Sequence, residues 1–479
     1  MSTTAPAFKV SEIELHEIPV VLRMPFRFGV VTLRQCFQAF VRVRIEFANG
    51  AYAWGTSAEM VVPKWFDKNT ALSDQDNFEQ ERDVLRIARE SYLGDSTPTS
   101  AFSHFARHHD EHLAFCDKRG YNPLLASYGP ALIDRALIDA LCKHEQKSFY
   151  QVMQSNLAGI SEEHSQFQDI DWEHFLSQCK PAQSIHARHT VGLVDAITTS
   201  DVIEVVNDGL PETLEHVVAH YGHRYYKLKV SGQIDKDIDR LTAIACVLER
   251  IPNGYQASLD GNEQYQSAQE LEVLLGKMRE TPALKQMMQS ILFIEQPIAR
   301  HHALDVDLKT RPLGLPVIID ESDGTLDAFV LAKEKGYAGI SSKTCKGVYK
   351  SILNASRCSQ WNQEQKQMQY FMSAEDLTVQ AGISVQQDLA LVNLIGVKHV
   401  ERNGHHYVNG LASRPKIEQS QFLKEHADLY ENTHGAVRLH IQNGQMQIGS
   451  LACVGFASAV EPDFSAMYAL GQCPSSVQK

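Results

Sequence analysis

The first part of the chain changes from an alternating pattern of hydrophobic and polar residues to a helical one. Residues 10–20 (VSEIELHEIPV) alternate, and residues 36–55 (CFQAFVRVRIEFANGAYAWG) predict two strands joined by a tight turn at Asn49-Gly50. From about Asp74 to Ala158, hydrophobic residues recur at helical spacing. Within this region, residues 131–153 predict an amphipathic helix whose apolar face is formed by Ile133, Leu137, Ile138 and Leu141.

From Ser184 onward, short apolar runs alternate with helical stretches such as residues 235–251 and 267–280. The runs are YYKLKV, YQASLD, ILFIEQ, PVIIDES, YAGISSK and MQYFMS, at residues 225–230, 255–260, 291–296, 316–322, 337–343 and 368–373. Strands that alternate with helices indicate βαβ units and a parallel sheet. At least six units fit a closed β/α barrel better than an open sheet. After Lys416 the pattern becomes antiparallel again, and residues 435–451 predict a second hairpin around Asn443-Gly444, which we expect to join the N-terminal unit.

Each predicted barrel strand ends in polar residues. In the run RYYKLKVSG, Lys227 and Lys229 point to the same side of the strand, opposite Tyr226, Leu228 and Val230, because successive side chains of a strand alternate between its faces. The ends of the next strands carry Asp260 with Asn262, then Glu295, then Asp320 with Glu321, and then Lys343. Each step is one strand, one helix and one loop long, so these residues occupy equivalent positions. Catalytic groups of β/α barrels gather at these carboxyl ends, and the two lysines therefore point into a polar mouth.

Three carboxylates at one barrel mouth repel one another unless a cation lies between them. Oxygen ligands favour a hard cation such as Mg²⁺, which keeps positions open for water or substrate. Lysines beside such a cation have lowered pKa values, so one of them could act as a base.

The motifs Lys-x-Lys, LDGN, FIEQP, IIDES and SSK together resemble the enolase superfamily, in its mandelate racemase and muconate lactonizing enzyme family. Residues 130–153 are similar to the helix that precedes the barrel in that family. The absence of a histidine near YFMSAED and the presence of Lys343 make the chain more similar to the muconate lactonizing type. The resemblance implies a modified β/α barrel with an α+β capping domain built from both chain ends. We expect residues 1–180 to form the capping domain with a helical insert, 181–416 the barrel, and 417–479 a segment that returns to the cap.

The resemblance also assigns roles to the strand-end residues. It implies Mg²⁺ on Asp260, Glu295 and Asp320, and general acid/base roles for Lys229 and Lys343 on opposite faces of the substrate. Lys227 is expected to tune the charge of Lys229 or to hold a substrate carboxylate, and Asn262 and Glu321 to orient the ligands. The sequence KTCKGVYKS departs from the family pattern, so Lys346 is a second candidate for the role of Lys343.

The chemistry that this family implies is removal of a proton α to a carboxylate, with the resulting enediolate held on Mg²⁺. Reprotonation on the opposite face gives racemisation or epimerisation, whereas loss of a β-group gives dehydration or cycloisomerisation of an acid sugar or a similar carboxylate. A non-catalytic protein with the same barrel is a third possibility, which the intact set of lysines and carboxylates opposes. Residues 23–29 and 54–60 resemble the two cap loops that close over the substrate. Arg27 and Phe28 are then candidates for substrate contact, although Phe26 and Phe28 could equally pack between domains.

Composition and charge exclude several other classes. The 479 residues carry a net charge of −13 without a long basic block, which argues against nucleic acid or an anionic membrane as a partner. Nine scattered cysteines are typical of reduced thiols in the cytoplasm, and no signal peptide or membrane-spanning run is evident. We expect a cytoplasmic homo-oligomer that acts on a small carboxylate.

A histidine row occurs in residues 102–115 (FSHFARHHDEHLAF). His104, His108 and His112 share one helix face, and His109 lies beside them. Histidines at this spacing can bind Zn²⁺. Because no cysteine or carboxylate constellation accompanies them, a solvated helix face is the favoured interpretation.

Overall fold

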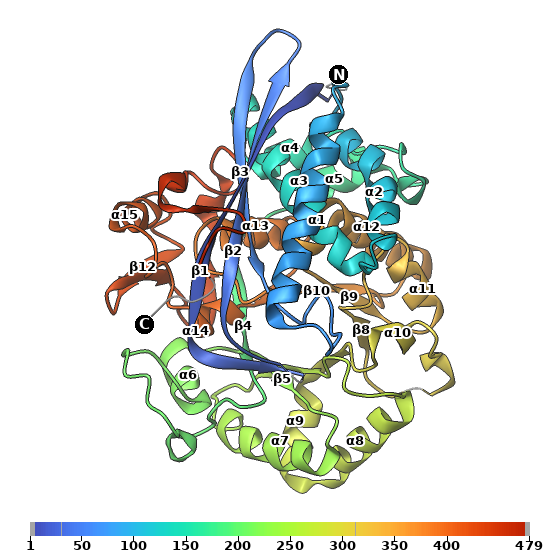
Figure 1. Cartoon of the computed structure of the whole chain (residues 1–479). Coiled ribbons are helices and arrows are strands. Elements are labelled where there is room, and N and C mark those ends of the chain that lie inside the picture. The colour runs from blue at the N-terminus through green and yellow to red at the C-terminus, as the bar shows by residue number, and fades with distance from the viewer. Residues whose placement is uncertain (1–4, 30, 312, 475–479) are drawn as a thin grey trace.

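The computed structural model describes residues 5–29, 31–311 and 313–474, which form an antiparallel sheet with covering helices and a parallel barrel (Figure 1). The antiparallel sheet has the strand order β15-β1-β2-β3. Its strands are β1 (Phe8–Phe28), β2 (Val31–Phe47), β3 (Tyr52–Val61) and β15 (Tyr468–Ala469). The predicted turn at Asn49-Gly50 joins β2 to β3, with Gly50 at a φ of 82° that favours glycine.

The predicted helical region packs beside this sheet, as Figure 1 shows. It contains α1 (Asp74–Gly94), α2 (Ala101–Asp117), α3 (Pro123–Glu145) and α4 (Phe149–Gln154), followed by α5 (Trp172–Gln178). The expected amphipathic character of α3 is wrong, because every residue from Leu124 to Cys142 is buried. The helix lies against β2 and β3 on one side and against α1 and α2 on others. At Gly55 of β3 a Cβ atom would lie 2.1 Å from the carbonyl oxygen of Ala136, so only glycine allows this close approach.

The histidine row of α2 is buried, and the expectation of a solvated helix face is also wrong. His104, His108 and His112 are 0%, 8% and 4% exposed. The Nε2 atoms of His104 and His112 bond the carbonyl oxygens of Phe8 and Ala126, both at 2.9 Å. The row therefore faces β1 and α3 because its ring nitrogens find partners on the backbone there.

In the part of the chain that the structure describes, the barrel consists of eight parallel strands. They are β4 (Ser184–Val191), β5 (Tyr225–Lys229), β6 (Gln256–Asp260), β7 (Ile291–Glu295), β8 (Val317–Ile319), β9 (Gly339–Ser342), β10 (Phe371–Ala374) and β11 (His399–Glu401). The surrounding helices are α6 (Leu214–Tyr221), α7 (Ile234–Leu248), α8 (Ala268–Glu280), α9 (Lys285–Ser290), α10 (Arg300–Ala303), α11 (Ala328–Glu334), α12 (Val348–Gln365), α13 (Ile383–Leu394) and α14 (Asn403–Tyr407). The predicted β/α barrel with an α+β cap is confirmed.

The barrel has one seam without ladder pairing. Hydrogen-bonded pairing runs from β10 through β9 to β4 and on to β11, and among the described residues β10 and β11 touch without pairing. Arg188 of β4 spans this seam from inside the barrel. Its guanidinium donates to Ser373 Oγ at 3.0 Å and to the carbonyl oxygen of Ala374 at 2.8 Å, both on β10. A charge-assisted side-chain bond thus links strands that the backbone does not join.

The C-terminal segment contacts both units. It contains α15 (Lys416–Glu425), the hairpin strands β12 (Tyr430–Thr433) and β13 (Ala436–Leu439), and β14 (Gln445–Gln447). The turn at Asn443-Gly444 forms, but β14 pairs with β4 of the barrel, so the expectation that this hairpin joins the N-terminal sheet is wrong. It is β15 that returns to that sheet, beside β1. The domain boundaries themselves stay a prediction.

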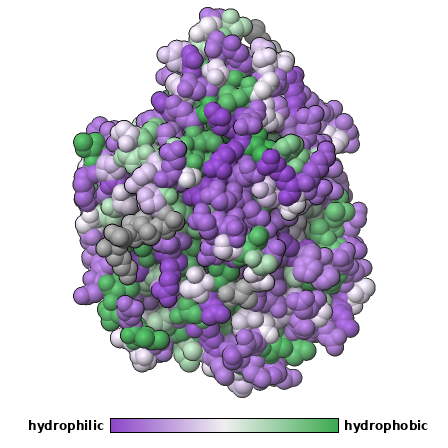
Figure 2. Space-filling view, in the orientation of Figure 1, coloured by the Kyte–Doolittle hydropathy of each residue, from purple (hydrophilic) through white to green (hydrophobic). Residues whose placement is uncertain are grey.

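The visible face of the molecule is mainly polar, with hydrophobic residues in separate patches (Figure 2). Among the described helices, none combines the length and the apolar character that crossing a bilayer requires.

Burial also places an acid inside the helical layer. Asp134 of α3 is 1% exposed and accepts a hydrogen bond from the Tyr92 hydroxyl at 2.7 Å. Burial raises the pKa of Asp134 to about 8, and the bond from Tyr92 offsets only part of this rise. The folded state therefore keeps a proton that the unfolded state releases near pH 4. Protonated Asp134 therefore favours the folded state. Its contribution to the free energy of unfolding is complete below pH 4 and is lost as the pH rises toward 8.

We predict that Asp134→Asn raises the melting temperature more at pH 7 than at pH 5, because an amide has no proton to lose. Linkage over two pH units corresponds to a difference of about 3 kcal/mol in the free energy of unfolding. Thermal unfolding of both proteins at the two pH values tests this. The exposed Asp117→Asn serves as a control and should shift the melting temperature equally at both pH values. An equal shift in Asp134→Asn would contradict a raised pKa.

Candidate active site

The two lysines of β5 enter the barrel because the strand alternates its side chains. Tyr226 and Leu228 point outward into the hydrophobic layer between strands and helices, where both are 0% exposed. Lys227 and Lys229 point inward and are 0% and 5% exposed. The polar barrel mouth that their positions predicted is therefore present.

Lys227 is the centre of a buried ionic cluster. Its Nζ atom lies 2.9 Å from Asp260, 3.1 Å from Glu295, 2.5 Å from Glu375 and 3.0 Å from Glu401. These carboxylates stand at the ends of β6, β7, β10 and β11. Burial alone would lower the pKa of Lys227, but the four carboxylates outweigh it and hold the pKa well above its ordinary value. Lys227 is therefore a permanent cation that joins strands from two sides of the barrel.

Three of the carboxylates are close enough to share a cation. Oxygen atoms of Asp260, Glu295 and Glu375 all lie within 4.8 Å of one another. The Oε2 atom of Glu295 is buried and has no hydrogen-bond partner, and burial followed by the charge of Glu375 raises the pKa of Glu295 well above its ordinary value. An unpartnered oxygen in a ring of carboxylates fits a divalent metal ion that prefers oxygen ligands.

The charge balance of the cluster supports the same conclusion. Five carboxylates, of Asp260, Glu295, Asp320, Glu375 and Glu401, meet four lysines, Lys227, Lys229, Lys343 and Lys346, in ion pairs that are almost wholly buried. When all groups are ionised, one negative charge remains uncompensated. A buried charge is costly unless it is paired, and a bound cation would compensate it.

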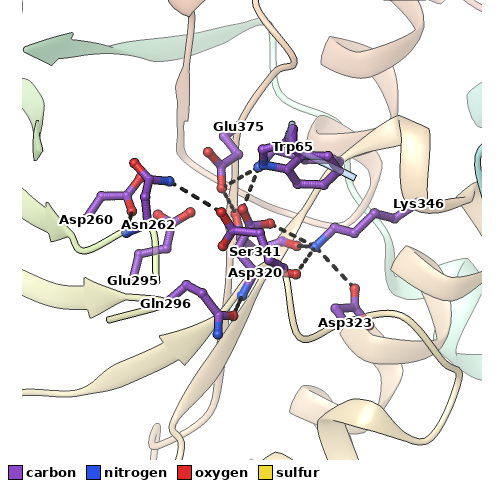
Figure 3. Close-up of polar contacts among 12 residues, drawn as sticks. Trp65, Asp260, Asn262, Glu295, Gln296, Asp320, Asp323, Ser341, Lys346 and Glu375 are labelled. Atoms are coloured by element: carbon purple, nitrogen blue, oxygen red, sulfur yellow. Dashed lines mark hydrogen bonds and ion pairs between the residues drawn. The ribbon is translucent and has the colours of Figure 1, made fainter. Parts of the chain in front are cut away.

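Asp320 follows β8 and forms ion pairs with the two lysines that follow β9. Its carboxylate pairs with Lys343 at 2.6 Å and with Lys346 at 3.0 Å. Its backbone amide donates to the side chain of Gln296 at 2.7 Å. In Figure 3, Asp260, Asn262 and Glu295 lie on one side of Asp320, and Lys346 approaches from the other.

Lys229 and Lys343 line one cavity from opposite walls of the barrel. Lys229 ends β5 and Lys343 follows β9, and these strands are four positions apart in a barrel of eight. Lys229 bonds Asp260 at 2.5 Å. Burial would lower the pKa of Lys343, but Asp320 and Glu375 outweigh it and hold the pKa above its ordinary value. The cavity measures about 30 Å³, room for roughly two water molecules.

Lys346 occupies a different position from Lys343. It lies in the turn after β9 and does not line the cavity. Its ammonium group donates to the carboxylate of Asp320 and to the carbonyl oxygens of Asp320 and Ser341, at 3.0, 3.1 and 2.5 Å. Since an ammonium group has three donors, these contacts occupy all of them.

Asn262 and Glu321 lie beside the carboxylates of the site, and Asn262 contacts both Asp260 and Glu321. The backbone amide of Asn262 donates to Asp260 at 2.9 Å, and its side-chain amide reaches Glu321 at 3.4 Å. Burial raises the pKa of Glu321 to about 7, although the nearby Lys68 acts in the opposite direction. Lys68 comes from the cap and lies 3.7 Å from Glu321.

The cap supplies residues that the sequence analysis did not identify. The segment after β3 places Trp65 in the cavity wall, where its ring lies 4.3 Å from the Lys343 Nζ atom. Residues 54–60, expected to form a cap loop, lie within β3 instead, because they pair with β2 along its length. Phe28 lines the cavity together with Phe26, whereas Arg27 is exposed and does not line it.

Glu375 and Glu401 were also missed. Each follows or ends a strand of only three or four residues, β10 or β11, so the period-two signal is short. The run SAED, at residues 373–376, does follow an apolar segment in the same way as the other strand ends, and this could have indicated Glu375.

Comparisons with known proteins place this geometry in a known fold. No protein-family model matches the chain, and no curated protein matches it. Solved structures do match. A mandelate racemase/muconate lactonizing protein from Herpetosiphon aurantiacus is 14% identical, with a TM-score of 0.59 over 95% of this chain and 99% of that one.

Two further matches have named activities. A dipeptide epimerase from Enterococcus faecalis, complexed with Mg and the dipeptide L-Leu-L-Tyr, is 13% identical, with a TM-score of 0.59 over 94% of this chain and 99% of that one. The 2-chloromuconate cycloisomerase from Rhodococcus opacus is 15% identical, with a TM-score of 0.57 over 95% and 98%. The structural neighbours are thus epimerases and cycloisomerases. The chain has the capped β/α-barrel fold of mandelate racemase/muconate lactonizing proteins.

Proposed function

We propose that this chain is a Mg²⁺-dependent enzyme that removes the proton α to a carboxylate, and that it acts as a racemase or epimerase. The observation that carries the proposal is the placement of Lys229 and Lys343 on opposite walls of one cavity, beside carboxylates with uncompensated charge. The named activities of the structural neighbours, epimerisation and cycloisomerisation, support this type of reaction.

The proposed metal ligands are Asp260, Glu295 and Asp320, from the neighbouring strands β6, β7 and β8. Glu375 is the alternative third ligand, since its oxygen atoms lie within the same 4.8 Å group as those of Asp260 and Glu295. Mg²⁺ bound there would supply positive charge where negative charge develops on the substrate carboxylate, which is usually the largest single contribution to catalysis.

The two lysines move the proton. A base must lie within hydrogen-bond reach of the α-carbon proton, and an acid on the opposite face must return a proton for the configuration to invert. Lys229 and Lys343 have this opposed placement. Lys227, which all four of its carboxylates hold as a cation, keeps the strand ends together and contributes fixed positive charge.

The cavity wall also limits the substrate. Phe26, Phe28 and Trp65 of the cap make its outer side apolar. This favours a carboxylate with a hydrophobic substituent over a polyhydroxylated acid sugar, because polar groups buried against aromatic rings lose their hydrogen bonds to water. At about 30 Å³ the cavity is smaller than any such substrate, so the aromatic segments must move for the substrate to enter.

A second reaction has its own support. Lys343 lies over Trp65 and pairs with Asp320 and Glu375, which favours its protonated form. A lysine fixed as a cation can assist a leaving group but cannot act as a base. Elimination by a dehydratase or cycloisomerase, with Lys229 as the one base, is therefore the alternative. A non-catalytic barrel is less consistent with the intact set of lysines and carboxylates.

Hydrogen exchange distinguishes these reactions. In D₂O with Mg²⁺, and with N-acyl amino acids, dipeptides and acid sugars as probes, we expect exchange of the α-proton in at least one compound. For that compound Lys229→Ala should abolish exchange from one enantiomer and Lys343→Ala from the other, each by about 10²–10⁴-fold. NMR of the α-proton provides the measurement.

The same variants can also contradict the proposed racemase or epimerase activity. Wild-type exchange of both enantiomers by Lys343→Ala would favour the one-base elimination. If Lys346→Ala then abolished exchange from one enantiomer, the acid/base role proposed for Lys343 would pass to Lys346. Absence of exchange in every probe, with the folded protein saturated with Mg²⁺, would favour the non-catalytic barrel.

Metal affinity identifies the third ligand. Glu295→Gln should weaken Mg²⁺ binding in calorimetry by at least about tenfold, because it removes a charge while keeping the shape. If the neighbouring strands β6, β7 and β8 supply the ligands, Asp320→Asn should have a comparable effect and Glu375→Gln a smaller one. The reverse order would assign the third position to Glu375. Unchanged affinity in Glu295→Gln would contradict the metal site.

A further inference from the structure

A second group of possible metal ligands lies in the helical layer. Asp95 directly follows α1, and His104 and His108 stand one helical turn apart on α2. One oxygen or nitrogen atom from each lies within 4.8 Å of the others. None of the three lines the active-site cavity.

Each of the two imidazoles has one buried ring nitrogen without a hydrogen-bond partner. The Nδ1 atom of His104 and the Nε2 atom of His108 are buried and have no hydrogen-bond partner. The opposite nitrogen of each ring is occupied, by the carbonyl oxygen of Phe8 at 2.9 Å and by Ser91 Oγ at 3.0 Å. Because a carbonyl oxygen can only accept a hydrogen bond, the neutral His104 ring must carry its proton on Nε2. Its Nδ1 atom then has a lone pair that no donor occupies. A metal-binding histidine has the same arrangement, in which the second nitrogen is held by an outer partner.

Packing fixes both rings. The His104 ring stacks on Phe8 at a centroid distance of 5.3 Å, and the His108 ring lies 4.8 Å from that of Tyr92.

The two carboxylate oxygens of Asp95 make different contacts. Its Oδ1 atom accepts the Thr97 amide at 2.9 Å, and its Oδ2 atom lies 3.6 Å from His108 Nε2. Two ligands of a tetrahedral ion with metal–ligand bonds of ~2.1 Å are about 3.4 Å apart, so this spacing needs little adjustment. Arg107 also lies 3.7 Å from Asp95 Oδ2, but its side chain is 39% exposed, and such a surface pair is weak enough to be displaced.

We propose that Asp95, His104 and His108 bind a zinc ion that fastens the end of α1 to α2. Two imidazoles and one carboxylate are a ligand set that zinc accepts, with a remaining position for water. Solvent can reach that position beside Asp95, which is 19% exposed. The ion would hold the connection between the two helices in place.

His112 provides a comparison within the same helix. It is buried, its Nε2 atom bonds the Ala126 carbonyl oxygen at 2.9 Å, and its Nδ1 atom has no partner. Among the described residues no carboxylate forms a metal-binding group with it. Its Nε2 atom also lies 3.5 Å from Cys116 Sγ. Zinc bound by His112 and Cys116 is therefore the competing site that the test must exclude.

The test uses the full chain after chelator treatment, reduced and saturated with Mg²⁺. We expect calorimetry to detect a Zn²⁺ site that Asp95→Asn weakens by at least about 100-fold. Asp95→Asn keeps the oxygen that accepts the Thr97 amide, so the local fold should persist. His108→Gln should have the same effect, and His112→Gln should leave Zn²⁺ affinity unchanged. Co²⁺ in place of Zn²⁺ should give visible absorption bands in the wild type that are absent from Asp95→Asn.

Three results would overturn the proposal. They are Zn²⁺ affinity that is equal in wild type and folded Asp95→Asn, loss of the site in His112→Gln, and loss in Asp260→Asn, which would place the ion in the barrel. Zn²⁺ should also raise the melting temperature of the wild type and of Asp260→Asn, but not of Asp95→Asn. This inference does not depend on the proposed catalytic function, and either can fail without the other.

Discussion

The barrel mouth depends on one buried cation. Lys227 is 0% exposed, and its ammonium group lies within 3.1 Å of four carboxylates from four strands. Removing one partner of a buried ion pair costs about 3–5 kcal/mol, because the other charge remains without compensation. Each carboxylate is therefore held in place by the lysine, and the lysine by the carboxylates. The same arrangement leaves Glu295 with a free oxygen, which is where an added cation finds a ligand.

The cap is attached to this mouth through charged contacts of its own. Arg300 of the barrel donates to the carbonyl oxygens of Trp65 and Phe66 at 2.8 and 2.9 Å, and also to Glu263 at 2.8 Å. Arg23 of β1 donates to Asp208 at 2.6 Å. These contacts fix the ends of the two cap segments that carry Trp65 and Phe28. Since the cavity is too small for a substrate, the aromatic side chains between the anchors have to move while the anchors keep the cap in register.

Local patterns in the sequence were sufficient for the barrel and most of its polar mouth. Alternation in YYKLK sets the direction of Lys227 and Lys229, and each strand end places one polar group at the same level. Patterns of this kind contain no information on long-range pairing. The turn at Asn443-Gly444 was predicted correctly, yet β14 pairs with β4, a strand that lies far earlier in the chain. The full burial of α3 follows from contacts on several sides, which hydrophobic periodicity along one helix does not report.

The histidine row shows the same limit at short range. Spacing along one helix correctly places His104 and His108 on one face, but it does not indicate which element covers that face. The segment between α1 and α2 turns back within a few residues, so Asp95 comes to lie beside His108 although it belongs to the end of the preceding helix. The proposed ligand group thus joins two histidines that are four residues apart on one helix, His104 and His108, with Asp95, which belongs to no periodic pattern. In the barrel, by contrast, every ligand candidate ends a strand or directly follows one, and its position repeats with each βα unit. Repetition made the positions of most polar groups at the barrel mouth predictable from the sequence. No such repetition marks Asp95, the carboxylate that accompanies the histidines.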